Sequence, residues 1–112
     1  MNYYCLVLLF HIFFVGPMMV YLGLKHATVN DYVWKGLIVL GLGIIAYHLA
    51  LYWQFQNPVN AFHIFVVGPA FILLALYHST IPTIIWDVVV MMGIGVPLFH
   101  AYKFFSAKGV CY

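Results

Sequence analysis

Four long apolar segments, separated by short polar breaks, dominate the pattern of this 112-residue chain. Each segment is close to the ~20 residues that a helix needs to cross the hydrocarbon core of a bilayer. The breaks are so short that consecutive helices should run antiparallel. The pattern therefore predicts an all-α membrane protein with four transmembrane helices in an up-down-up-down bundle, at about Tyr3–Leu24, Val33–Phe55, Val59–Tyr77 and Ile84–Phe105.

The composition of the chain also indicates a membrane protein. Hydrophobic residues make up 67% of the chain and charged residues 5%, which is typical of an integral membrane protein. We expect a multi-pass protein with both termini on one side and with the lipid bilayer as its main partner. Lys103, Lys108 and the free amine favour termini inside only slightly over Lys25 and Lys35 on the other side. The chain has no Arg and only scattered Lys, so nucleic-acid binding has no electrostatic footprint and we expect no nucleic-acid partner.

All six histidines recur at one spacing, which indicates an internal duplication. His11 and His63, His26 and His78, and His48 and His100 are each 52 positions apart. Aligned without a gap, residues 10–53 and 62–105 share 15 identities in 44 pairs. We therefore predict a single transmembrane domain, 1–112, built from repeat 1 at about 3–55 and repeat 2 at about 56–107. Because two crossings separate equivalent helices, the repeat should be parallel, with its two-fold axis along the membrane normal.

Helix spacing predicts the depth of the histidines. His11 lies 13 residues before Leu24 and His48 lies 15 residues after Val33, so both should lie ~20–22 Å from that end of their helices. The repeat adds two more, giving one layer toward the termini and inside the bundle. The residues of this layer are His11, His48, His63 and His100. The opposite interface should carry His26, His78, Trp34 and Trp86.

Three kinds of chemistry suit such a histidine layer. The imidazoles could ligate a transition metal, or two of them could hold a haem iron axially. They could relay protons, or they could only donate hydrogen bonds to neighbouring helix carbonyls. The chain has no Glu, which excludes the carboxylate-bridged di-iron sites of many four-helix bundles. The sequence therefore does not identify a cofactor, and it leaves a transition metal and haem as the candidates.

Prolines and cysteines add local features. Pro17 and Pro69 each follow a glycine inside a predicted helix and should kink it. Cys5 and Cys111 lie near the two termini, so a disulfide is conceivable if that side is oxidising. The sequence contains no Asn-x-Ser/Thr glycosylation site.

Enzyme motifs are missing from the sequence: it has no phosphate-binding loop, no dinucleotide fingerprint and no carboxylate pair. We therefore expect a non-catalytic structural or accessory subunit of a larger membrane assembly, associated with other membrane subunits or with copies of itself. The alternatives are a metal- or haem-binding electron-transfer protein and a proton or ion conductor.

One resemblance covers nearly the whole chain. The order His11-Ile-Phe-Phe-Val-Gly-Pro17, a short basic turn, Trp34, a glycine-rich helix and Tyr47-His48 resembles small duplicated four-helix membrane proteins encoded by large DNA viruses. The resemblance implies a membrane component of a viral particle or of an infected-cell membrane.

Overall fold

The computed structural model describes residues 2–111, and every regular element in that range is a helix. Two α-helical spans are interrupted by π-helical turns, η1 and η3, and the first span ends in a 3-10 turn, η2. In chain order the elements are α1 (Tyr3–Phe10), η1 (His11–Val15), α2 (Gly16–Lys25), η2 (His26–Thr28), α3 (Asp31–Phe55), α4 (Pro58–Phe62), η3 (His63–Val67), α5 (Gly68–Leu76) and α6 (Thr83–Ser106).

Four continuous helical spans are long and apolar enough to cross a membrane. Their limits are Tyr3–Thr28, Asp31–Phe55, Pro58–Leu76 and Thr83–Ser106. This confirms the number and the approximate position of the predicted helices, although the first span continues four residues beyond Leu24. The six charged residues lie at or near the ends of these spans, so the middle of each span carries no charge.

Asparagines start three of the spans. The side-chain oxygens of Asn2, Asn30 and Asn57 accept hydrogen bonds from the backbone N–H groups two residues later, at 3.1, 2.8 and 2.9 Å. Such N-caps satisfy donors that the first helical turn leaves without a backbone partner. The breaks that contain Asn30 and Asn57 therefore separate two helices and also cap the start of the second one.

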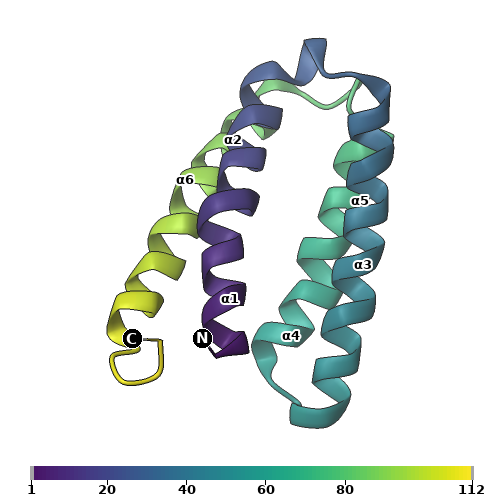
Figure 1. Cartoon of the computed structure of the whole chain (residues 1–112). Coiled ribbons are helices and arrows are strands. Elements are labelled where there is room, and N and C mark those ends of the chain that lie inside the picture. Colours follow the sequence, from purple (N-terminus) through teal and green to yellow (C-terminus); the bar gives the residue numbers. More distant parts are fainter. Residues whose placement is uncertain (1, 112) are drawn as a thin grey trace. The chain divides into compact units, whose positions relative to one another are not determined.

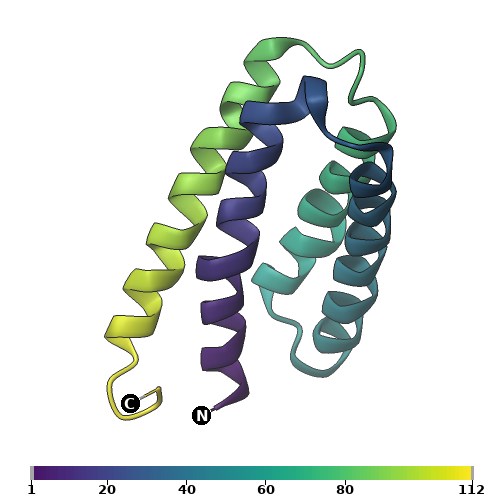
Figure 2. The ribbon, with the colours of Figure 1, turned by 45° about the horizontal axis from the view of Figure 1, so that its top comes forward.

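The helices pack as two compact units. Unit 1 contains the described residues 2–26 and 82–111, and unit 2 contains residues 27–81. In unit 1, α6 runs beside α1, η1 and α2; in unit 2, α3 runs beside α4, η3 and α5 (Figure 1). A second view shows the same partners in each unit (Figure 2). Each unit therefore combines one span from each predicted repeat, so a helix packs closely against a helix of the other repeat.

A pair of facing glycines brings the helices of each unit together. A Cβ added to Gly93 would lie 2.9 Å from the carbonyl oxygen of Gly16 in unit 1. A Cβ added to Gly41 would lie 2.8 Å from the carbonyl oxygen of Gly68 in unit 2. Both distances are too short for a real side chain, so the two backbones approach closely only because these residues are glycine.

π-Helical turns occupy the segments before the two Gly-Pro pairs. Gly16 N–H donates to the carbonyl of His11, and Gly68 N–H donates to that of His63, five residues earlier in each case. The proline that follows each glycine has no N–H and crowds the preceding turn. A wider turn is one way to accommodate it, and the span continues through Pro17 and Pro69 into α2 and α5. These are the places where the sequence predicts kinks.

Candidate functional site: two stacked histidine pairs

In unit 1 the first histidine pair joins the beginning of the chain to its end. His11 is the first residue of η1 and His100 lies in α6. Their ring centroids are 4.3 Å apart and the ring planes differ by only 5°. The two imidazoles therefore lie face to face across the helix–helix contact, and both are partly buried.

In unit 2 the equivalent positions form the second pair. His63 begins η3 and His48 lies in α3; the ring centroids are 4.1 Å apart and the planes differ by 19°. The four histidines that the sequence places in one layer are thus brought together two by two, one pair within each unit.

Backbone carbonyls fix the orientation of three of these rings. His11, His63 and His100 each have Nδ1 2.7 Å from the carbonyl oxygen four residues earlier, at Val7, Val59 and Val96. A carbonyl oxygen only accepts, so Nδ1 carries the hydrogen and donates it. In the neutral ring the lone pair then belongs to Nε2 and lies in the plane of the ring.

His48 differs from the other three. Its Nδ1 donates to Oδ1 of Asn60 at 2.8 Å instead of to its own helix, and both residues are 9% exposed. The residue equivalent to Asn60 in unit 1 is Leu8, which offers no acceptor. A single polar residue one turn into α4 therefore redirects His48. The sequence pattern did not single out Asn60, although an amide inside an apolar run, 52 positions after Leu8, was a signal for it.

The other two histidines stack on tryptophans. His26 lies on Trp86 with centroids 4.8 Å apart in unit 1, and His78 lies on Trp34 with centroids 4.5 Å apart in unit 2. Trp86 and Trp34 are only 1% and 3% exposed. The two indole rings are therefore buried, whereas residues of an aromatic belt face lipid. Each histidine stacks on the tryptophan of the other predicted repeat, His26 on Trp86 and His78 on Trp34, and nothing in the sequence pattern indicated this choice of partner.

Stacked rings do not suit a shared metal ion. An ion bound by two imidazoles lies close to both ring planes, because each nitrogen lone pair is in its own plane. The nearly parallel planes of His11 and His100 provide no such common point. Among residues 2–111, no group of three or more His, Cys, Asp or Glu side chains could hold a metal ion.

A haem between the rings of one pair meets a similar difficulty. Two axial imidazoles, each with its nitrogen about 2 Å from the iron, would have ring centroids roughly 6 Å apart on opposite faces of the macrocycle. The pairs have centroids 4.3 and 4.1 Å apart and lie face to face. The arrangement in each unit therefore does not match axial ligation of one haem.

No family model, curated protein or solved structure matches this chain.

Proposed function

We propose that this chain is a duplicated, multi-pass membrane protein in which all four spans cross the bilayer up-down-up-down and both termini lie on one side. Residues 52 apart make equivalent contacts in the two units, as in the stacks of His11 with His100 and of His63 with His48. This equivalence supports a duplication. The apolar length of the four spans supports membrane crossing.

Within the membrane, the chain acts as a structural or accessory subunit. The observation that carries this proposal is the use of the histidines: each of the six stacks on another ring across a helix–helix contact. Offset-stacked aromatic pairs stabilise packing by about 0.5–1.5 kcal/mol beyond the burial of their area. The histidines therefore contribute to helix packing. The nearly parallel planes of the two imidazole rings in each histidine pair do not suit the binding of one metal ion by both rings.

The outer surface fits partners within the bilayer. Large apolar side chains are exposed on every span, and the equivalent residues Phe13 and Phe65 are both 75% exposed. Lipid or helices of other subunits would cover them. The resemblance to membrane proteins of large DNA viruses would place this assembly in the membrane of a viral particle or of an infected cell.

The test is the state of the full chain extracted from membranes in mild detergent. The proposal predicts a particle whose protein mass exceeds the 12.8 kDa of one chain, measured by light scattering with size-exclusion chromatography. It also predicts no stoichiometric metal and no haem absorption, with the same result for the double variant His11→Phe/His100→Phe, which keeps ring stacking and removes both ligands.

A monomer containing a stoichiometric metal or haem that this double variant loses would contradict the proposal and favour electron transfer. Proton flux in liposomes that this variant abolishes would favour a conductor instead. Mass spectrometry of the particle separates a homo-oligomer from an assembly with other subunits.

A further inference from the structure

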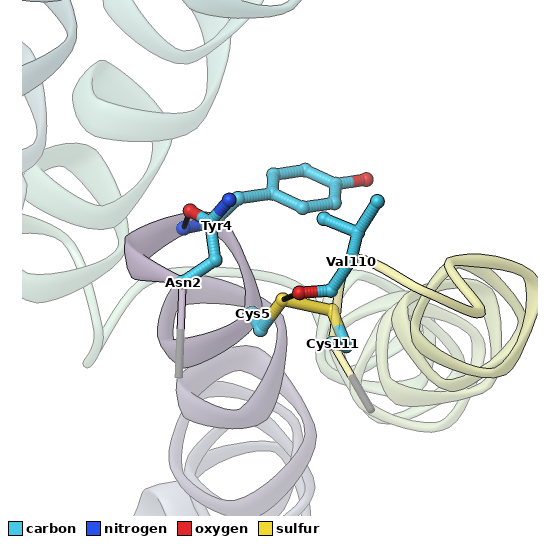
Figure 3. The surroundings of a disulfide bond; sticks show 5 residues. All are labelled: Asn2, Tyr4, Cys5, Val110 and Cys111. Carbon is cyan, nitrogen blue, oxygen red and sulfur yellow. Dashed lines mark hydrogen bonds between the residues drawn. A yellow bond between two sulfur atoms is a disulfide. The ribbon is translucent and has the colours of Figure 1, made fainter.

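A disulfide joins the two ends of the chain in unit 1. Cys5 lies in the first turns of α1, and Cys111 follows the end of α6. Their Cα atoms are 5.6 Å apart, within the usual range for a disulfide. The Cys5 side chain is fully buried, and its sulfur lies 3.7 Å from the carbonyl oxygen of Val110 (Figure 3). Because a disulfide sulfur has no hydrogen, this is a packing contact.

In unit 2 the corresponding helix ends are joined by the polypeptide chain itself. The residue 52 positions after Cys5 is Asn57, which belongs to the two-residue link between α3 and α4. Gln56 makes this turn with a left-handed φ of 48°, and Asn57 caps α4. The disulfide of unit 1 therefore stands where unit 2 has its turn: it ties α6 to α1 as the turn ties α3 to α4.

We infer that the membrane side carrying the chain ends faces an oxidising compartment, the lumenal or external side, and that the Lys25–Asp31 turn faces the cytoplasm. The inference rests on the four-span placement proposed above. Disulfides persist in oxidising compartments, and thiols stay reduced where glutathione and thioredoxin act. The disulfide between the first and last spans therefore requires an oxidising compartment on the side of the membrane where the chain ends lie.

The oxidation has a defined balance. Cys5 and Cys111 lose two protons and two electrons as their sulfurs bond. The disulfide of a thiol–disulfide oxidoreductase accepts them and becomes a dithiol, through a mixed disulfide with one of the two cysteines. The chain has only these two cysteines, so this is the only intramolecular pairing open to it.

The distribution of lysines between the two sides of the membrane does not contradict this orientation. Lys25 and Lys35 lie at the end of the spans away from the termini, and Lys103 and Lys108 lie at the end near them. The lysines are balanced, two on each side, so the excess of basic residues that usually sets topology is reduced to the free amine, which favours termini inside only slightly. The compartment that the disulfide requires then becomes the stronger argument.

The experiment maps both sides in the full chain, which has no glycosylation site of its own. One version carries an Asn-x-Thr acceptor on a flexible linker after the last residue, and another carries the same acceptor inserted at residues 27–30. Expressed in cells with a secretory pathway, the first version should be glycosylated and the second should not. Alkylation before lysis followed by a maleimide mass tag should give no label without reduction and two labels after it.

Matched variants separate the possible failures. Cys5→Ser leaves Cys111 as a free thiol that the first alkylation blocks, so it should give no label before or after reduction. Cys5→Ser/Cys111→Ser should keep the same glycosylation pattern with no label. Glycosylation of the turn version alone, or two free thiols in the quenched wild-type chain, would overturn the inference. Glycosylation of both versions would instead overturn the four-span placement itself.

Discussion

The two units use the same contacts but close them differently. Each has a stacked histidine pair, a stacked histidine and tryptophan, and two facing glycines. Unit 1 ties its helix ends with a disulfide, whereas unit 2 ties them with the turn at Gln56 and Asn57. The ring stacks and the close backbone approach therefore define the packing, because both units share them.

A second difference lies beside the histidine pairs. In unit 1, His100 donates to the carbonyl of Val96 in its own helix, while in unit 2 the equivalent His48 donates to Asn60 in the neighbouring helix. The ring stack forms in both cases. An interhelical hydrogen bond is therefore an addition to the stack rather than a requirement for it.

Removing the disulfide should have the largest effect and should fall on unit 1. The disulfide joins residues 106 positions apart, and a disulfide typically stabilises a protein by about 2–4 kcal/mol. Cys5→Ser should lower the free energy of unfolding in detergent micelles by an amount of that order. Hydrogen exchange should rise in α6 more than in α3. Equal loss of protection in both helices would show that the units do not hold together separately.

The facing glycines should come next. Gly93→Val and Gly41→Val each place a side chain against backbone of the partner helix, so each should cost about 1–3 kcal/mol of unfolding free energy. Gly43→Val and Gly95→Val are matched controls on the same helices, since nothing lies within 4 Å of an added Cβ there. We expect the controls to change stability by less than about 0.5 kcal/mol. Equal effects of tests and controls would rule out close packing at the glycines.

The histidine stacks should show a smaller, pairwise effect. A double-mutant cycle with His11→Ala and His100→Ala should give a coupling free energy of about 0.5–1.5 kcal/mol. The cycle with His48→Ala and His63→Ala should give a similar value, although His48 also loses its bond to Asn60. Additive single effects in either unit would mean that its two rings do not interact.

The smallest effect should distinguish the two units at one position. Asn60→Leu gives unit 2 the residue that unit 1 has at Leu8, so His48 loses its acceptor and can donate to its own helix, as His100 does. Interhelical hydrogen bonds between membrane helices are worth about 0.6 kcal/mol on average, and the variant should lose about that much stability. The reciprocal Leu8→Asn should strengthen unit 1 only if His100 turns toward the new amide. A loss near zero for Asn60→Leu would show that the bond contributes nothing.

Sequence predicted the helices well because their signal is local. Apolar runs of span length, and Asn or Gly-Pro at defined places, are visible without any knowledge of the fold. Histidines 52 positions apart make the same kind of stack in the two units. Partner choice was harder: His11 and His48 belong to one predicted repeat, yet each stacks on a histidine of the other.

Partner choice depends on long-range packing. Periodicity places a residue on a face of its helix but does not say which helix meets that face. The facing glycines were visible only as small residues, and Asn60 only as an isolated amide. Burial of Trp34 and Trp86 likewise follows from helix pairing, which the pattern of one chain does not contain.

In the structure the first span packs against the fourth and the second against the third. Site-directed cross-linking in membranes, on a Cys5→Ser/Cys111→Ser background, tests this pairing. Cysteine pairs that replace His11 with His100, and His48 with His63, should form cross-links with a short bifunctional thiol reagent, since the native rings are 4.3 and 4.1 Å apart. A cysteine pair replacing the exposed Phe13 and Phe105 serves as the outward-facing control and should form none. Failure of both histidine-position pairs, with cross-linking of positions 11 and 48 instead, would contradict this pairing.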